Sequence, residues 1–360
     1  MRHTICFFNT TKAWGGGEKW HFDLSQYLFE KNYDVIVVCQ TDSELHKRLA
    51  KTKIKHLALN IHKLSYLNPL KIRGLVKIFK KEKIETIIMN LSSDLKLAAH
   101  AAKKAEVKRI IYRRGSAIPL KNSFYNRFIF KNWVDEILVN SEETKRTINK
   151  NNPTLFPESK IKVIYNGINI DRFNDCLNKK NNEKIILGNI ARLEKQKGHK
   201  LLIDIANILK EKKLNFELRI VGDGSLFGQL KQQIEKQNLT EYVKLLGYRS
   251  DIDNFLKNID IFLLSSLWEG FGYVLTEAMA CYTPVVAFNI SSNPEIVEHN
   301  KTGYLIPPFE LETFANAVFK LASDKNLRTE FGINARRRVE NLFDQEKIFK
   351  EIEHYLAPRS

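Results

Sequence analysis

Short runs of apolar residues alternate along the chain with longer stretches in which apolar residues recur every three or four positions. The short runs are bounded by polar and turn-forming residues, which is typical of strands buried on both faces of a parallel sheet. The longer stretches have the spacing of helices with one buried face. Strands are therefore predicted in the first half at 5–9, 35–39, 87–90, 109–112, 136–140 and 162–165, and in the second half at 185–190, 217–221, 243–246, 261–264 and 285–287. This alternation predicts an α/β fold built on parallel sheets with covering helices.

The alternation breaks once, at residues 174–183, which are rich in Asn and Lys and have no apolar period. An Asn-Gly turn at Asn166 precedes this break and favours the end of a domain there. A length of 360 residues also fits two domains. We expect the following division of the chain: a first domain at 1–173, a linker at 174–183, a second domain at 184–343 and a terminal helical segment at 344–360.

Two carboxylates, Glu269 and Glu277, flank a turn that contains Gly272 and leads from a buried strand into a predicted helix. Such a turn lies at the carboxyl edge of a parallel sheet. There, helix amides can receive a phosphate, and carboxylates can accept hydrogen bonds from hydroxyls. Two glutamates at this spacing also occur by chance, so the interpretation needs support from the rest of the chain.

A basic loop that carries Arg192 and Lys197 follows the predicted strand 185–190. An arginine fork and a lysine charge can neutralise a leaving diphosphate, although a solvated basic loop is the alternative. A further strand ends at Gly222, but the next glycines give the spacing G-x-G-x-x-x-G, and no acidic residue ends a plausible second strand. A dinucleotide-dependent oxidoreductase is therefore a weak interpretation.

Three consecutive glycines, Gly15, Gly16 and Gly17, follow the first predicted strand and precede a helix predicted over 19–31. Without Cβ atoms, such a segment can adopt φ > 0 and bring its amides close to a ligand. An ordinary flexible turn is the alternative.

Together these segments resemble the retaining glycosyltransferases of family four, and the resemblance covers nearly the whole chain. It implies a GT-B architecture of two Rossmann-like domains that face a cleft, with the terminal helix returning to the first domain. It also implies metal-independent transfer of a hexosyl unit from a nucleoside-diphosphate sugar to a glycan or glycolipid, with no cofactor, by a front-face displacement in which the donor phosphate helps to deprotonate the acceptor. The implied site residues are Glu269 for the donor-sugar hydroxyls, Arg192 and Lys197 for the diphosphate, Glu277 for the ribose, the amides of Phe271 and Gly272 for sugar and phosphate, and Gly15, Gly16, Gly17 and Gly222 for donor binding.

The chain departs from the family pattern at two places. Where members carry a His near the end of a first-domain strand, this chain has Arg113 and Arg114, so no general base is evident there. These arginines either bind an anionic acceptor or donor phosphate or belong to a basic rim. Where members often have Gly-Gly before x-Pro-Glu, this chain has Ser291 and Ser292, which preserve small size.

Charge is distributed unevenly: residues 1–175 hold 32 Lys and Arg against 17 Asp and Glu, a balance of +15 of the total +17. Within this half, residues 69–81 place apolar residues on one helical face, and residues 124–133 are dense in aromatic and basic residues. Each segment alone fits a core-packed helix with a basic rim. Together they favour an anionic partner, and a membrane surface or phosphorylated glycolipid fits better than nucleic acid, because no nucleic-acid-binding motif is present.

The remaining candidate metal-binding, cysteine and membrane-targeting signals in the sequence are few. Asp251 and Asp253 form an Asp-x-Asp that in another architecture would hold a metal, but here they open a predicted helix, so a cap at Ser250 or Asp251 is favoured and no metal site is expected. The four cysteines are scattered, which predicts reduced, buried thiols. No membrane span or signal peptide is evident, so we expect a cytoplasmic enzyme of lipopolysaccharide or surface-polysaccharide synthesis, peripheral on the inner face of the membrane. A catalytically inactive GT-B carbohydrate-binding or assembly subunit is the alternative.

Overall fold

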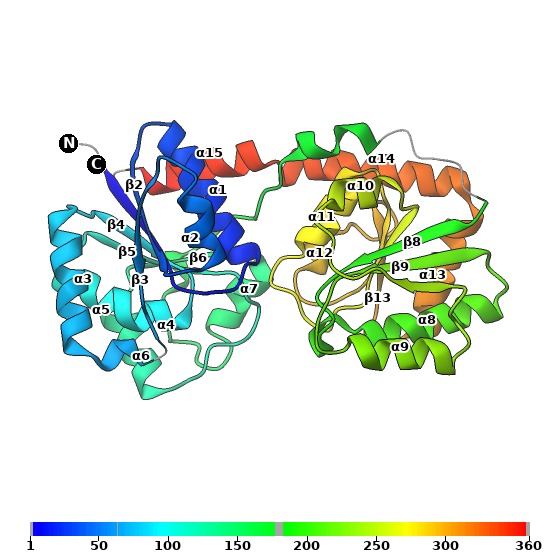
Figure 1. The fold of residues 1–360 in the computed structure, drawn as a ribbon, viewed down its shortest axis with the longest axis horizontal. Coiled ribbons are helices and arrows are strands. Elements are labelled where there is room, and N and C mark those ends of the chain that lie inside the picture. Colours follow the sequence, from blue (N-terminus) through cyan, green and yellow to red (C-terminus); the bar gives the residue numbers. More distant parts are fainter. Residues whose placement is uncertain (1–2, 63, 177–182, 358–360) are drawn as a thin grey trace. The chain divides into compact units, whose positions relative to one another are not determined.

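The structure, a computed structural model, describes residues 3–62, 64–176 and 183–357. The chain divides into two compact units, one made of residues 1–166 and 348–360 and the other of residues 167–347. Figure 1 shows that each unit is built around its own sheet. Residues 177–182 of the predicted linker lie outside the described residues.

The first unit contains a seven-stranded parallel sheet in the order β3-β2-β1-β4-β5-β6-β7. Its strands are β1 (Thr4–Asn9), β2 (Asp34–Gln40), β3 (Lys55–Leu59), β4 (Thr86–Met89), β5 (Arg109–Arg114), β6 (Glu136–Val139) and β7 (Ile161–Val163). Its helices are α1 (Gly16–Glu30), α2 (Glu44–Leu49), η1 (Ser65–Leu67), α3 (Pro69–Lys81), α4 (Ser92–Asp94), the π-helical η2 (Leu95–Ala99), α5 (His100–Lys104), α6 (Phe124–Asn132), α7 (Glu142–Ile148) and η3 (Glu158–Lys160).

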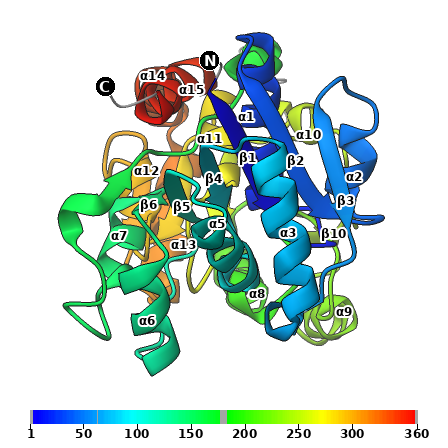
Figure 2. The same ribbon diagram turned by 90° about the vertical axis from the view of Figure 1, so that its left-hand side faces the viewer.

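Helices cover both faces of this sheet because successive side chains of a strand point to opposite faces. On β1, Cys6 and Phe8 pack with the core on the side of α3, α5 and α6. Ile5 and Phe7 pack with the core on the side of α1 and α2. Figure 2 shows the sheet between these two sets of helices.

The last helix, α15 (Gln345–Leu356), completes the second of these cores. Its buried side chains Ile348, Phe349, Ile352 and Leu356 join the cluster that contains Ile5 and Phe7. Tyr27 of α1 also donates a hydrogen bond to Glu353, at 2.9 Å. The first unit is therefore closed by the C-terminal segment of the chain.

The second unit contains a six-stranded parallel sheet in the order β10-β9-β8-β11-β12-β13. Its strands are β8 (Ile185–Ile190), β9 (Phe216–Val221), β10 (Val243–Leu245), β11 (Ile261–Leu264), β12 (Val285–Phe288) and β13 (Gly303–Ile306). Its helices are η4 (Ile170–Cys176), η5 (Lys195–Lys197), α8 (His199–Glu211), α9 (Phe227–Lys236), α10 (Ile252–Lys257), α11 (Tyr273–Ala280), α12 (Asn293–Ile296), α13 (Leu311–Ser323) and α14 (Lys325–Leu342). The predicted α/β class with parallel sheets is confirmed.

Every predicted strand is present within one or two residues, but β3 and β13 were not predicted. Strand β3 lies at the sheet edge and is only partly buried, so its sequence lacks a fully apolar run. Strand β13 contains only four residues and also lies at an edge. Short edge strands carry the weakest hydrophobic signal.

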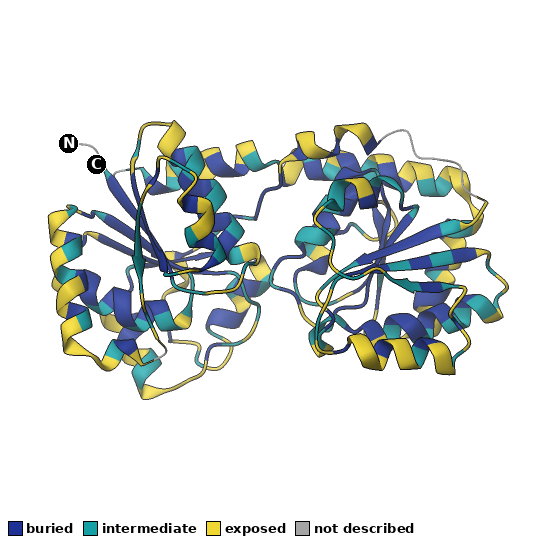
Figure 3. Ribbon diagram, in the orientation of Figure 1, coloured by how far each residue is buried: buried dark blue, intermediate teal, exposed yellow. Residues whose placement is uncertain are grey.

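Helix α3 has the predicted amphipathic pattern. Its buried residues are Ile72, Leu75 and Phe79, while Val76, also predicted on the buried face, is half-buried. The lysines at 77, 80 and 81 are exposed. Figure 3 shows exposed residues along the outer side of this helix and buried residues in the sheet behind it.

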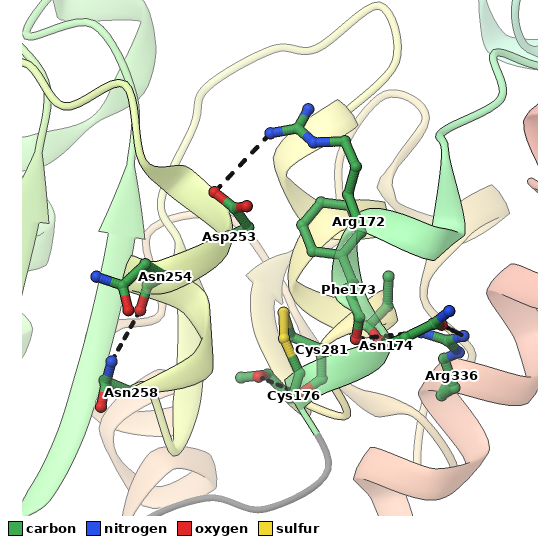
Figure 4. The surroundings of a disulfide bond; sticks show 11 residues. Arg172, Phe173, Asn174, Cys176, Asp253, Asn254, Asn258, Cys281 and Arg336 are labelled. Carbon is green, nitrogen blue, oxygen red and sulfur yellow. Dashed lines mark hydrogen bonds and ion pairs between the residues drawn. A yellow bond between two sulfur atoms is a disulfide. The ribbon is translucent and has the colours of Figure 1, made fainter.

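The prediction of four separate reduced thiols was wrong for one pair, since Cys176 of η4 and Cys281, directly after α11, form a disulfide (Figure 4). Their Cα atoms are 4.9 Å apart, although 105 residues separate them in sequence. The guanidinium of Arg336 fixes η4 beside this pair by donating to Asn174, at 2.8 Å, and to the carbonyl of Ala280, at 2.9 Å. The cysteines meet because of this tertiary packing, which spacing alone does not reveal.

Candidate active site

Lys197 and Glu269 come together in the second unit. Lys197 ends η5, Glu269 follows β11, and the Nζ of Lys197 donates to Oε1 of Glu269 at 2.6 Å. The hydroxyl of Ser266 donates to the same oxygen at 2.7 Å. Both charged side chains are largely buried, with relative exposures of 16% for Lys197 and 8% for Glu269. Ser266 was missed in the sequence, although its place at the end of a strand just before the motif is a usable signal.

The loops that carry this pair are joined by their backbones. The amide of Leu267 donates to the carbonyl of Gln196 at 2.8 Å, and the hydroxyl of Ser265 donates to the carbonyl of Lys197 at 3.1 Å. Gly198 follows Lys197 with φ +65°, and a Cβ there would lie 2.0 Å from the carbonyl oxygen of Ser265. Only glycine fits this position, so the contact fixes where Lys197 enters the site.

Arg192 lies on the same loop and is exposed. Its neighbour Leu193 donates from its backbone amide to the carbonyl of Asp223 at 2.9 Å, which ties the loop after β8 to the loop after β9. Gly222 has φ +143°, and a Cβ there would lie 1.9 Å from the carbonyl oxygen of Ala191. Gly222 thus has a packing role that supports the loop of Arg192.

The turn after Glu269 leads into α11 as predicted. Phe271 is buried and packs edge-on against Phe343, with ring centroids 5.7 Å apart. Gly272 is the N-cap residue of α11, and Glu277 lies half-buried within that helix. The turn is therefore at the carboxyl end of β11 and at a helix N-terminus, where backbone amides favour an anion.

In the first unit, the glycine segment differs from its predicted form. Helix α1 begins at Gly16 instead of Lys19, with Gly15 as its N-cap residue at φ −161°. None of the three glycines has the expected positive φ, which among the described glycines occurs only at Gly198, Gly222, Gly224 and Gly247. A Cβ at Gly17 would lie 2.4 Å from the side-chain nitrogen of Asn90, so a larger residue there would require the Asn90 side chain to move.

Asp94 lies beside this segment and had no recognised motif in the sequence. Its carboxylate is fully buried and accepts hydrogen bonds from the amide of Thr10, at 3.1 Å, and from the Thr10 hydroxyl. Burial raises the pKa of Asp94 to about 7 against the opposing effect of these hydrogen bonds. The nearby charge of Glu18 raises the pKa further. The first unit therefore contains a buried carboxyl group whose pKa lies near neutral pH.

Arg113 and Arg114 end β5 but differ in their surroundings. The guanidinium of Arg113 donates to Asn90 and to Asn166, both at 2.9 Å, and lies 4.5 Å from the ring of Trp20. Arg114 donates to the Tyr112 hydroxyl, at 3.3 Å, and to a backbone carbonyl, and it lines a cavity of about 470 Å³. Arg113 thus holds first-unit elements together, whereas Arg114, although buried, lines a cavity.

Both aspartates of the Asp-x-Asp at the start of α10 form ion pairs with arginines. Asp251 is the N-cap residue but does not cap with its side chain; instead it pairs with Arg249. That hydrogen bond lowers the pKa of Asp251 to about 2. Asp253 lies 3.9 Å from Arg172. Within residues 3–62, 64–176 and 183–357, no group of three or more His, Cys, Asp or Glu side chains has the geometry to hold a metal ion.

No helix among the described residues combines the length and apolar character needed to cross a membrane.

Two family models match almost the whole chain. The model described as Glycosyltransferase Family 4 matches residues 14–172, and the model described as Glycosyl transferases group 1 matches residues 173–338. Together they extend over both the glycine segment and the Lys197–Glu269 pair.

Individual proteins agree with these matches. The chain is 28% identical over 344 residues to the UDP-Gal:alpha-D-GlcNAc-diphosphoundecaprenol alpha-1,3-galactosyltransferase of Escherichia coli, covering 89% of this chain and 87% of that protein. It is 30% identical over 289 residues to an uncharacterized glycosyltransferase of Methanocaldococcus jannaschii, covering 68% and 70%. The crystal structure of Anabaena HepE in complex with UDP superposes with a TM-score of 0.83 over 99% of each chain, at 24% identity, which establishes a shared fold.

Proposed function

Because this chain belongs to glycosyltransferase family four and has the GT-B architecture, we propose that it transfers a hexosyl unit from a nucleoside-diphosphate sugar to a glycan or lipid-linked acceptor, with retention at the anomeric carbon. The E. coli relative is named for a UDP-sugar donor and a lipid-linked diphosphate acceptor, which supports the two substrate classes. Synthesis of lipopolysaccharide or another surface polysaccharide is the setting that fits them.

The hydrogen-bonded cluster of Lys197, Glu269 and Ser266 carries this proposal. Oε1 of Glu269 accepts from both partners, and we propose that Oε2 accepts from a donor-sugar hydroxyl. The ammonium of Lys197 has three N–H bonds and uses one of them on Glu269. The others serve the donor diphosphate, which couples recognition of the sugar to stabilisation of the leaving group.

The neighbouring residues complete the donor site. Arg192 is exposed on the loop of Lys197 and reaches the diphosphate as a bidentate donor. The amides of Phe271 and Gly272 precede α11 and hold sugar and phosphate, and Glu277 accepts from the ribose hydroxyls. The amides of Gly15, Gly16 and Gly17 at the start of α1 bind the phosphate from the first unit.

For the chemical step, we propose a front-face displacement without a divalent metal. The acceptor oxygen attacks the anomeric carbon on the side from which the diphosphate leaves, and a diphosphate oxygen takes the acceptor proton. Arg192 and Lys197 carry the charge that develops on the leaving group. Activity that is abolished by a chelator and restored by magnesium or manganese would contradict this mechanism.

The first unit is proposed to dock on an anionic membrane where the acceptor is displayed. Support comes from the balance of +15 in residues 1–175 and from the exposed lysines of α3 at positions 77, 80 and 81. Each Lys near an anionic surface contributes roughly 1 kcal/mol, screened over about 8 Å at physiological salt. Charge reversal at these three positions should weaken co-sedimentation with anionic liposomes without affecting donor binding. Equal binding to neutral liposomes would reject electrostatic docking.

The decisive experiment is a thermal-shift panel of nucleoside diphosphates and their sugars. A ligand at about 100 times its dissociation constant stabilises the folded state by roughly 2.7 kcal/mol. The stabilising nucleotide sugar is then tested for turnover in the wild type and in Glu269→Ala, for which we expect an intact fold and severe loss of transfer. An unchanged rate in Glu269→Ala, or no stabilisation by any nucleotide, would refute the assignment.

A further inference from the structure

The cavity beside Arg114 is a second charged site, separate from the residues assigned to the donor. It is lined by residues of α4 and η2, which connect β4 to β5, by residues of β5, and by residues of α6 and the segment before it. The lining residues are Ser92, Leu95, Lys96, Tyr112, Arg114, Pro119, Leu120, Lys121, Ser123, Tyr125, Asn126 and Phe130. This set contains three cations and no acidic residue, so the cavity selects for an anion.

Arg114 is the most informative residue of this cavity. Its side chain is 92% buried on the basis of a relative exposure of 8%, yet its Nε has no hydrogen-bond partner among the described residues. Nη1 and Nη2 of Arg114 donate to the Tyr112 hydroxyl and to the carbonyl of Ile118, and Nε is closed to solvent, so Arg114 gives the cavity wall a fixed positive charge. Such a charge favours an anion in the cavity.

Lys96 is held at the cavity by two aromatic rings. Its Nζ lies 5.2 Å from the ring centre of Tyr66 and 5.4 Å from that of Tyr125. It is part of η2, a single π-helical turn, and such turns frequently occur at functional sites. Lys121 lies on the exposed segment before α6 and adds a further positive charge to the cavity.

Three large apolar side chains on η1, α3 and α6 are exposed to solvent. Phe124, at the start of α6, is 77% exposed. Leu67 of η1 is 65% exposed and Leu70 at the start of α3 is 71% exposed. The contact between Tyr66 and Tyr125, with ring centroids 6.0 Å apart, places η1 against α6, so these apolar groups belong to one end of the first unit. Figure 2 shows α3 and α6 reaching that same end.

We propose that this cavity binds the phosphate or diphosphate of a lipid-linked acceptor while Phe124, Leu67 and Leu70 contact the apolar part of the membrane. The cations match the phosphate, and the exposed apolar side chains favour a lipid over a soluble phosphate ester. This inference rests on the proposed transfer reaction, since it supplies the anionic end of the acceptor. It adds a specific anion site to the general electrostatic docking of α3.

The test uses the full-length protein and vesicles of phosphatidylcholine that contain polyprenyl phosphate. Control vesicles contain phosphatidylglycerol at equal charge. The wild type should bind the polyprenyl phosphate vesicles more tightly than either the control vesicles or pure phosphatidylcholine. The double variant Lys96→Gln/Lys121→Gln should lose this preference by roughly tenfold or more, because two charges near the lipid phosphate are removed. Arg127→Gln, an exposed change on α6 that does not line the cavity, is the matched control and should keep the preference.

Two further measurements separate the possible outcomes. Inorganic pyrophosphate should compete only weakly with the vesicles, and full competition would assign the cavity to a soluble anion and overturn the proposal. Retention of the preference in the double variant, or no preference in the wild type, would also overturn it. Thermal shifts with UDP should be equal in wild type and double variant, so failure of this cavity to bind lipid phosphate is distinguishable from failure of the donor site.

Discussion

Replacing Lys197 by Ala should destabilise the second unit and slow transfer, for two separable reasons. Its Nζ lies 2.6 Å from Oε1 of Glu269, whose side chain is 8% exposed in the wild type, and the remaining carboxylate would keep the Ser266 hydroxyl as a neutral partner. Removing one member of a buried pair costs about 3–5 kcal/mol, and the Ser266 hydrogen bond places this case at about 3 kcal/mol. For a unit of this size, that corresponds to a fall in melting temperature of roughly 6–12 °C.

A double variant separates stability from catalysis. Lys197→Ala/Glu269→Gln removes the uncompensated charge, so it should recover about 2 kcal/mol of the lost unfolding free energy. It should not recover turnover, because the cation for the leaving diphosphate is still missing and Glu269 is changed as well. We expect Lys197→Ala to be slower by about a hundredfold and the double variant to be slower by at least as much. Lys195→Ala changes an exposed lysine of the same short helix and serves as the control.

Urea unfolding and release of the nucleoside diphosphate measure these two effects. Equal destabilisation in the single and double variants would show that the pair is not an electrostatic unit. Full turnover in Lys197→Ala would remove Lys197 from the leaving-group role.

Three further predictions concern single positions. Gly198→Ala should lower the free energy of unfolding, measured with urea, by roughly 2 kcal/mol or more, because φ is +65° and the new Cβ would meet a backbone carbonyl oxygen at 2.0 Å. Gly228→Ala, whose Cβ would lie in open space, should lower it far less. Ser291→Gly should raise the free energy of unfolding by about 1 kcal/mol, because φ is +46° at this position. Ser292→Gly, at φ −84°, should not raise it, and equal effects of the two substitutions would contradict this explanation. Burial raises the pKa of Asp94 from 3.8 to about 7, so the folded state holds this proton more tightly than the unfolded chain. The stability that Asp94 contributes is present at low pH and lost as pH rises through about 7, and Asp94→Asn should remove this slope from thermal unfolding measured between pH 4 and pH 8.

Much of the fold could be predicted because buried parallel strands carry continuous apolar runs. Strands such as β1 and β11 are entirely buried, and their sequences contain that information without reference to the rest of the chain. Strand β3 depends on pairing with β2 at a sheet edge, and its partly polar sequence becomes a strand only in that context.

The candidate site residues could be proposed from the sequence where one segment holds the whole motif. Glu269 lies on the turn before α11, Glu277 lies within that helix, and Lys197 lies in a recognisable basic loop. Asp94 could not be identified in this way, because its raised pKa depends on burial and on Thr10, 84 residues earlier. The partners of Arg113 are likewise distant, since Asn166 lies 53 residues away.

The same limit applies to glycines and cysteines. A Cβ at Gly17 would meet the side chain of Asn90, a contact that is invisible in the run of three glycines. Cys176 and Cys281 meet only after η4 packs beside the end of α11.

The position of α15 determines when the first unit can finish folding. All seven of its strands are synthesised early, but Ile348, Phe349 and Leu356, which complete the core around Phe7, leave the ribosome only after the whole of residues 167–347. Domains usually fold in the order of their synthesis, and transiently exposed apolar surface promotes aggregation. The first unit must therefore wait, with one face of its sheet incompletely covered, while the second unit is made. A chain that terminates before α15 would lack Ile348, Phe349 and Leu356 and would leave the core around Phe7 incomplete, even though nearly all of the second unit had been made.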